Sequence, residues 1–271
     1  MEERLLAWFR EQGRDLPWRR TRDPYAILVS EVMLQQTQVE RVIPRFTAWL
    51  ERWPNAESLA AAPLADVLRF WQGLGYNRRA VNLHRAARQI VSDGWPGDLT
   101  ELPGVGRYTA DAVARFALGA QVLPVDTNVR RVQERTGARF GPASAHALMD
   151  LGATVCLARI PRCSVCPLAG GCPSRGRRYP PLRKQSRFEG SFRQRRGSTL
   201  RLVTEQPRRI TELDPEAVNA LVRDGLIHVE GEVVALLADD ADVAVAEERV
   251  EVEVYLPVGL HELRDSPLDR P

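Results

Sequence analysis

The segment from Leu102 to Asn128 constrains the fold most, because it places a glycine turn, an amphipathic helix and a carboxylate in close succession. Gly104 and Gly106 lack a Cβ, so the backbone can turn tightly and approach another surface. The free amides at the start of the following helix suit a phosphate. Asp126 precedes a further helix, whose dipole favours the ionised carboxylate. On the glycines alone, an ordinary turn is an equally good interpretation.

Short amphipathic segments separated by proline or glycine predict a mostly α fold of packed helices. Helices are expected at Arg4–Arg10, from Pro24 behind an Asp23 cap, at Val42–Trp53, Leu64–Trp71 and Arg78–Ser92, from Thr109, and at Ala143–Leu157, Gly197–Thr204 and Asp214–Asp224. Residues 225–236 alternate around a Glu230-Gly231 turn, as a β-hairpin does. The last helices and this hairpin look like a small winged-helix module, which could also be a packing unit that reads no bases.

Charge is distributed unevenly, although the formal net charge is only +3. The stretch from Pro173 to Arg209 holds twelve basic residues against two acids, a composition typical of a polyanion-binding segment. The stretch from Asp239 to Glu253 is acidic and is either a solvated end or a competitor for the basic segment. No apolar run is long enough to cross a membrane, and the acidic start after Met1 is unlike a secretory leader. We therefore expect a cytoplasmic protein without a membrane partner.

The cysteines of this chain form one cluster with the spacing C-x6-C-x2-C-x5-C. They are Cys156, Cys163, Cys166 and Cys172. In a reducing compartment such clustering favours metal binding over disulfides. Four thiolates without another ligand fit tetrahedral zinc and an iron–sulfur cluster equally well on chemistry alone.

Three motifs resemble those of the helix-hairpin-helix DNA glycosylases, the superfamily that includes endonuclease III and MutY, and the resemblance covers about residues 4–180. The glycine turn and Asp126 resemble the hairpin and aspartate of that superfamily. Residues 30–39, SEVMLQQTQV, resemble the MutY signature nearly letter for letter. The cysteine spacing resembles the cluster loop of the same enzymes, which favours a [4Fe-4S] cluster over zinc.

The resemblance implies a six-helix domain with the helix-hairpin-helix at 17–128 and an iron–sulfur domain from 1–16 and 129–178. Composition and pattern divide the remaining residues into a basic linker at 179–192, the winged-helix-like module at 193–237 and an acidic tail at 238–271. The C-terminal part is too short and too different for the Nudix-like domain that full-length relatives use to read 8-oxoguanine. How that lesion would be recognised is therefore left open.

The resemblance also implies catalytic roles. Glu31 matches the catalytic acid, although a glutamate in this helix, taken alone, would be interpreted as solvated or paired. Asp126 matches the anion that stabilises the sugar cation, with Tyr108 and Asn128 orienting it. Two carboxyls in different environments suit glycosidic bond cleavage, because one can stay protonated while the other stays charged.

Further residues match positions that bind the nucleotide. Trp18, Arg19 and His146 would line the base pocket, and Gln36 and Tyr76 would fill the gap in the base stack. The amides of Gly104, Val105 and Gly106 would hold a phosphate. His146 stands where relatives usually have a carboxamide or carboxylate, which leaves the identity of the excised base open.

The implied activity is that of a monofunctional, monomeric, nucleoid-associated glycosylase that removes adenine opposite 8-oxoguanine or guanine from double-stranded DNA after base flipping. Bifunctional relatives use a lysine at the position of Tyr108, and Lys184 is the one lysine of this chain. One alternative is a glycosylase for thymine or uracil opposite guanine, or for hypoxanthine. Another is a redox-sensing, iron–sulfur DNA-binding regulator without catalysis.

Overall fold

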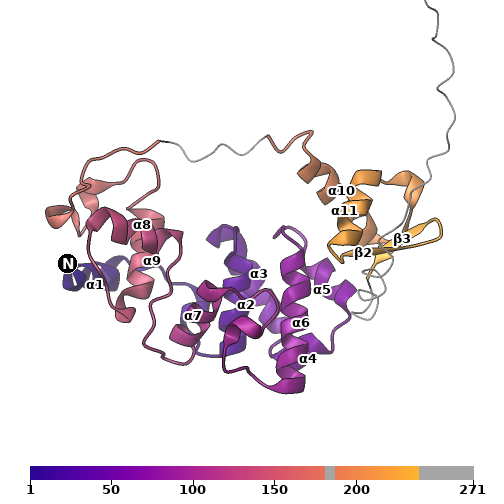
Figure 1. The fold of residues 1–271 in the computed structure, drawn as a ribbon, viewed down its shortest axis with the longest axis horizontal. Coiled ribbons are helices and arrows are strands. Elements are labelled where there is room, and N and C mark those ends of the chain that lie inside the picture. Colours follow the sequence, from indigo (N-terminus) through magenta and orange to yellow (C-terminus); the bar gives the residue numbers. More distant parts are fainter. Residues whose placement is uncertain (181–186, 238–271) are drawn as a thin grey trace, which may run out of the picture.

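The computed structural model describes residues 1–180 and 187–237, in which helices pack around two hydrophobic cores (Figure 1). The elements are α1 (Glu2–Gln12), α2 (Pro24–Leu34), α3 (Val39–Arg52), α4 (Ala56–Ala60), α5 (Leu64–Trp71), α6 (Arg78–Asp93), α7 (Arg107–Phe116), α8 (Thr127–Thr136), α9 (Ala145–Thr154), α10 (Phe192–Glu205), β1 (Arg208–Arg209), α11 (Pro215–Arg223), β2 (Ile227–Glu230) and β3 (Val233–Leu236). The predicted mostly α fold is confirmed. The acidic tail and part of the predicted linker lie outside the described residues.

Helix α2 runs through the middle of the first core. The carboxylate of Asp23 caps it by accepting hydrogen bonds from the amides of Tyr25 at 3.1 Å and Ala26 at 3.3 Å. Every residue from Tyr25 to Met33 is buried, because α3, α6 and α7 pack around this helix. A helix that is apolar on nearly all sides is buried on all sides. Glu31, which lies in its middle, is therefore carried into the interior.

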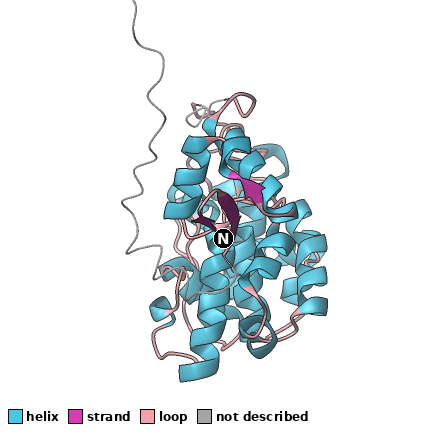
Figure 2. Cartoon of the chain, turned by 90° about the vertical axis from the view of Figure 1, so that its right-hand side faces the viewer, coloured by secondary structure: helices cyan, strands magenta, loops and turns pink. Residues whose placement is uncertain are grey.

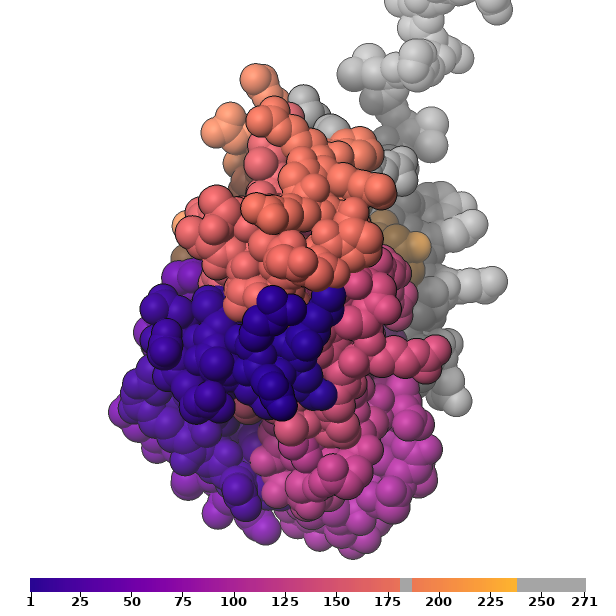
Figure 3. Space-filling model, turned by 90° about the vertical axis from the view of Figure 1, so that its left-hand side faces the viewer, coloured from indigo at the N-terminus to yellow at the C-terminus, as the bar shows by residue number. Residues whose placement is uncertain are grey.

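The second core is formed by α1, α8 and α9, which lie side by side at one end of the molecule (Figure 1). Leu5 of α1 and Leu148 of α9 are fully buried there. Glu2 fixes the N-terminus by accepting hydrogen bonds from the Gly141 amide at 2.9 Å and the Ser144 hydroxyl at 2.6 Å. Figure 3 shows the start of the chain, in indigo, against residues from this later part of the sequence.

A buried ion-pair cluster joins the two cores. Asp150 on α9 has a side chain only 1% exposed, and it accepts hydrogen bonds from two arginines that precede α2. Arg14 donates from its amide at 2.9 Å and from Nε at 2.8 Å, and Arg19 donates from Nη1 at 2.9 Å and from Nη2 at 2.8 Å. Burial acts to raise the pKa of Asp150, but these hydrogen bonds outweigh it and hold the pKa below its usual value.

The C-terminal module packs on α5 at the other end of the molecule. Leu200 and Val203 of α10 belong to the first core, and the Gln72 side chain donates to the Thr204 hydroxyl at 3.0 Å. Its sheet has the order β1-β3-β2, and Figure 2 views the molecule from this end. The predicted hairpin is present, with Glu230 opposite Val233 in an antiparallel pair. The module is thus continuous with the main core.

Several element bounds differ from the expectation. Helix α10 begins at Phe192 instead of Gly197, because the Ser191 hydroxyl caps it by accepting from the Gln194 amide. Helices α1 and α7 each begin two residues earlier than expected, α3 begins three residues earlier, and α9 is shorter at both ends. The short helix α4, which the sequence interpretation missed, starts at a capping box formed by Asn55 and Ser58. None of the helices in the described ranges has both the length and the apolar character needed to cross a bilayer.

Replacing Asp150 with Asn should destabilise the fold by about 3 kcal/mol, because it leaves the poorly exposed Arg19 without a counter-charge. Urea unfolding at pH 7 measures this, and Asp93→Asn, at an exposed position, is the control. Since the folded pKa of Asp150 lies below its unfolded value, its contribution is complete above about pH 4 and is lost as the pH falls through the lower folded value. A difference between parent and variant that does not shrink in acid would contradict this assignment.

Candidate active site

One pocket of about 640 Å³ lies where the two cores meet, between α2, the start of α7, the start of α8, and α9. Eight of the predicted site residues line it: Trp18, Arg19, Glu31, Gln36, Tyr108, Asp126, Asn128 and His146. Tyr76 and the residues of the glycine turn are not in its lining. The fold thus brings residues from positions 18 to 146 of the sequence around a single cavity.

Glu31 is a buried acid at the wall of this pocket, with 5% of its surface exposed. Burial raises its pKa to about 7, and the negative charge of Asp126 acts in the same direction. A hydrogen bond with the Tyr108 hydroxyl and the positive charge of Arg19 oppose the rise. Glu31 is therefore substantially protonated at neutral pH, which is the state a general acid needs.

Asp126 is the N-cap of α8. Its Oδ1 accepts from the Val129 amide at 2.6 Å, and its Oδ2 accepts from Asn128 Nδ2 at 2.8 Å. The carboxylate is half-buried and lies at the positive end of the helix dipole. These contacts hold it in one orientation at the edge of the pocket.

Arg131 supports the Asp126 cap from behind, and the sequence interpretation missed it. Its Nη2 donates to Asn128 Oδ1 at 2.6 Å and to the Gly152 carbonyl at 2.7 Å, while its Nε donates to the Cys156 carbonyl at 2.8 Å. Gly152 leaves room for this arrangement, since a Cβ there would lie 2.6 Å from the Asn128 Cβ. The i+3 spacing from Asn128 to Arg131 was the available signal.

Aromatic and cationic side chains also line the pocket. The His146 ring stacks on Phe116 with a centroid distance of 4.1 Å. Burial, together with the positive charge of Arg19, lowers the pKa of His146 to about 4, so the imidazole is neutral at neutral pH. Trp18 packs edge-on against Phe46. Asp150 fixes the Arg19 guanidinium, whose buried Nε has no hydrogen-bond partner within the described structure.

Gln36 and Tyr76 form a pair at the rim of the pocket. Both have positive φ, 58° and 47°, which is uncommon for residues other than glycine. The Tyr76 hydroxyl donates to Gln36 Oε1 at 3.3 Å, and 54% of the Tyr76 side chain is exposed. Strained backbone at an exposed aromatic is typical of a functional position.

Arg79 holds both strained loops, and the sequence interpretation missed it as well. It is buried, and it donates to the carbonyls of Val32, Met33, Gln35, Leu74 and Gly75 at 2.6 to 3.1 Å and to the Thr37 hydroxyl at 3.1 Å. Burial lowers its pKa to about 10, so it stays charged at neutral pH. Its place four residues before the buried Leu83, on the apolar face of α6, was the signal for its burial.

The glycine turn before α7 offers fewer amides than expected. Gly104 has φ 75°, and a Cβ there would lie 2.7 Å from the Asn82 side chain, so only glycine fits. Val105 was expected to present its amide, but this group donates to the Leu102 carbonyl at 3.1 Å and the residue is buried. Gly106 is exposed and caps α7, whose first-turn amides have no acceptor within the helix.

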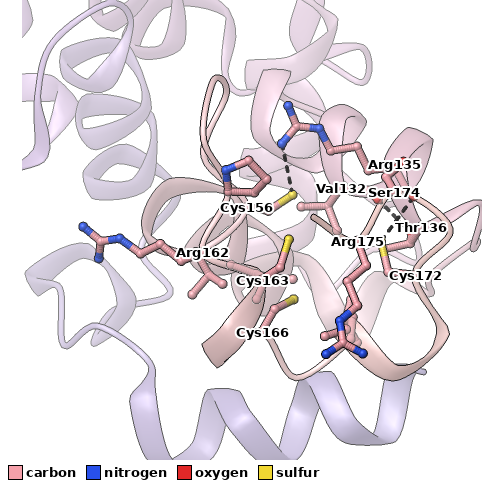
Figure 4. Close-up of a pocket in the computed structure, with 15 residues that line it drawn as sticks. Val132, Arg135, Thr136, Cys156, Arg162, Cys163, Cys166, Cys172, Ser174 and Arg175 are labelled. Carbon is pink, nitrogen blue, oxygen red and sulfur yellow. Dashed lines mark hydrogen bonds between the residues drawn. The ribbon is translucent and has the colours of Figure 1, made fainter. Parts of the chain in front are cut away.

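The four cysteines line a small cavity at the end of α9 (Figure 4). Arg135 Nη1 donates to Cys156 Sγ at 3.5 Å, and the Gly176 amide donates to Cys163 Sγ at 3.3 Å. Arg135 also ties the loop down by donating to the carbonyls of Leu157 and Ala158. Within the described part of the chain, no group of three or more Cys, His, Asp or Glu residues is arranged to hold a single metal ion.

Comparisons with known proteins agree with this geometry. Residues 29–149 match the family described as HhH-GPD superfamily base excision DNA repair protein. The adenine DNA glycosylase of Mycolicibacterium smegmatis is 44% identical over 267 residues, covering 82% of this chain and 91% of that protein. The chain belongs to the adenine DNA glycosylase family. The adenine DNA glycosylases of Mycobacterium tuberculosis and Homo sapiens are 42% and 40% identical, covering 82% and 64% of this chain and 88% and 39% of their own lengths.

Two solved structures are similar to this chain in fold. A thermostable thymine-DNA glycosylase is similar with a TM-score of 0.58 and 28% identity, over 64% of this chain and 93% of that one. Endonuclease III in a trapped covalent complex with DNA, at 24% identity, has a TM-score of 0.55 over 64% of this chain and 92% of its own. The predicted helix-hairpin-helix glycosylase fold is confirmed.

Replacing Arg79 with Lys should lower the free energy of unfolding by about 2 kcal/mol, because several buried carbonyls lose a donor at about 1 kcal/mol each. Hydrogen exchange should accelerate at residues 35–37 and 73–76, since one guanidinium holds both loops. The adjacent Arg78, exposed on the same helix, provides the matched control as Arg78→Lys. Equal exchange in the two variants would show that Arg79 does not position these loops.

Proposed function

We propose that this protein is a monofunctional DNA glycosylase of base excision repair, which flips adenine out of the duplex and hydrolyses its N-glycosidic bond when the opposite base is 8-oxoguanine or guanine. The observation that carries this proposal is a buried glutamate with a raised pKa and a capped aspartate lining one pocket. Relatives named adenine DNA glycosylases, 40% to 44% identical, support the choice of base. The enzyme would act as a monomer on nucleoid DNA.

The two carboxyls suit the two demands of the reaction. An N-glycosidic bond breaks through a cationic sugar, and adenine leaves readily only when protonated. Glu31, with a pKa of about 7, would donate its proton to N7 of the flipped base. Asp126, fixed by Asn128 and the Val129 amide, would stabilise the positive charge on the sugar until water attacks its C1′.

The pocket has the size and the donors for an extruded base. Its volume of about 640 Å³ lies in the usual range for small-ligand sites. A neutral His146 can donate from one ring nitrogen and accept at the other, as the mixed donor and acceptor edge of adenine requires. The buried, unpartnered Nε of Arg19 is a further donor. Gln36 and Tyr76 would occupy the gap left in the duplex.

Strand cleavage is not expected of this site. A β-lyase forms a Schiff base through an amine, and Tyr108, hydrogen-bonded to Glu31, lies at the pocket where such an amine would be needed. Lys184, the one lysine in the sequence, lies outside the described residues. We therefore propose that the product is an intact strand with an abasic site.

A second candidate activity is excision of thymine or uracil opposite guanine, which the 28% identity to a thymine-DNA glycosylase favours. The burial and raised pKa of Glu31 weigh against it, because a pyrimidine has no N7 to protonate. The two activities give products from different duplexes, so one assay separates them.

We propose that the four cysteines hold a [4Fe-4S] cluster, because the chemistry of their donor set suits one. Its donor set is four thiolates on short segments, with amide and guanidinium N–H groups directed at two of the sulfurs. Cys156, Cys163, Cys166 and Cys172 would hold it. When bound, the cluster would supply a structural crosslink between the end of α9 and the loop after it.

A panel of duplexes with adenine opposite 8-oxoguanine or guanine, thymine or uracil opposite guanine, and hypoxanthine tests the proposed activity. Adenine should be released from the first two, and the strand should stay uncut until alkali is added. Glu31→Gln should slow single-turnover release by about 10²- to 10⁴-fold, because it removes the general acid. Because the Glu31 pKa is about 7, the parent rate should fall as the pH rises above 7.

Asp126→Asn should also slow release, by about 10²-fold or more, through loss of the charge facing the sugar. Glu51→Gln, an exposed change on α3, is the matched control and should leave the rate unchanged. Faster release of thymine or uracil than of adenine would favour the second candidate. Tight binding without product from any duplex would favour a non-catalytic regulator.

Protein isolated without oxygen should contain about four iron and about four sulfide ions per chain, as a [4Fe-4S] cluster requires. Cys166→Ser should lower the iron content and the thermal stability of the second core, since the crosslink is weakened. Ser164→Ala, in the same loop, is the control. Stoichiometric zinc with no sulfide would overturn the cluster assignment.

A further inference from the structure

A second large cavity, a groove of about 790 Å³, separates the C-terminal module from the loop that carries Tyr76. We call it the module groove. One side is formed by residues 72–77 with Arg41 of α3, and the other by α10 and the end of α11. The groove shares no lining residue with the active-site pocket. Neither the chemistry nor the base pocket described above uses it.

Positive charge dominates the module groove. Arginine side chains line both sides of it: Arg41, Arg193, Arg196, Arg201 and Arg223. Asp224, the acid in the described lining, already forms an ion pair with Arg196. Arg201 and Arg223 are exposed on the faces of α10 and α11. This composition suits a polyanion, and the experiment below separates a nucleic-acid backbone from an acidic peptide segment.

Exposed aromatic rings stand among these arginines. Phe188 and Phe192 are 59% and 36% exposed, and Tyr76 is 54% exposed. Exposed apolar side chains that gather in one place often mark an interaction surface. Rings interleaved with arginines are typical of nucleic-acid surfaces, where they stack on bases or sugars while the guanidinium groups bind phosphates.

The position of the groove relative to the active-site pocket bears on which DNA strand it would face. Gln36 lines the active-site pocket, Tyr76 lines the module groove, and their side chains meet in the 3.3 Å hydrogen bond. This pair is therefore the border between the two cavities. If the pair enters a duplex, the strand with the flipped adenine lies on the pocket side. The complementary strand then lies on the groove side.

We propose that the module groove binds the phosphodiester backbone of the strand complementary to the adenine strand, through Arg201 and Arg223 together with Arg41. The inference rests on the proposed function, because the border pair assigns strands only if adenine enters the pocket. The proposal gives the groove arginines of the basic stretch from Pro173 to Arg209 a defined partner, the DNA backbone. It also gives the winged-helix-like module a role in DNA binding without requiring it to read bases.

Salt dependence of binding tests the groove. Every protein in this experiment carries Glu31→Gln, so that adenine stays attached to the DNA. The groove variant adds Arg201→Ala and Arg223→Ala. The control variant adds Arg10→Ala and Arg139→Ala, and therefore has the same net charge. Arg10 lies in the last turn of α1 and Arg139 lies just after the C-terminal end of α8, and both helices are at the other end of the molecule (Figure 1). Each phosphate contact contributes about 0.9 to the slope of log K against log salt, so the groove variant should lose about 1.8 and the control nothing.

Neutral methylphosphonate linkages identify the strand. Placed in the complementary strand, they should weaken binding by the Glu31→Gln protein more than by the groove variant. Placed in the adenine strand, they should weaken both equally. An unchanged salt slope, or equal losses from either strand, would overturn the inference. So would tighter binding by the groove variant, which would indicate that the acidic residues 239–253 occupy the groove. Adenine release by the parent protein tests the proposed function separately.

Discussion

The arrangement of the site depends on the buried carboxylate of Asp150. This group lies on α9 in the second core, and its partners Arg14 and Arg19 precede α2 of the first core. A charge so poorly exposed is tolerable only when it is paired and hydrogen-bonded, so the two cores must meet where these side chains meet. Because Arg19 also lines the active-site pocket, the contact that joins the cores also positions one of the pocket's side chains.

Two carboxyls acquire different chemistry from their positions in this framework. Glu31 is placed in the middle of a helix that is buried on every side, and burial raises its pKa. Asp126 lies at the start of α8, where it accepts hydrogen bonds from two N–H donors at the positive end of the helix dipole. Arg131 connects its support to the backbone of Cys156. The cysteine loop and Asp126 are thus parts of one hydrogen-bonded unit, even though 30 residues of sequence separate Asp126 from Cys156.

Local chemistry was predictable from the sequence, and long-range pairing was not. The Asp23 cap, the hairpin at Gly231 and the position of Asp126 at a helix start each depend on a few neighbouring residues, and the structure has all of them. The pairing of Asp150 with Arg19 joins residues 131 positions apart, and nothing local indicates it. The apolar face of α6 indicated that Arg79 and not Arg78 is buried, but nothing local indicated that its guanidinium would bind the carbonyls of Gln35 and Leu74.

The continuous packing of the C-terminal module on α5 has a mechanical consequence. Leu200 and Val203 are buried in the same core as α2, and Thr204 is hydrogen-bonded to Gln72 beside the Tyr76 loop. Moving the module away from α5 would expose this buried apolar surface, which opposes any widening of the module groove. In the complex proposed above, a misfit would then fall on the DNA, whose bending costs several kcal/mol and depends on the stiffness of its base steps. Lesions that soften the double helix would meet a lower barrier than intact pairs.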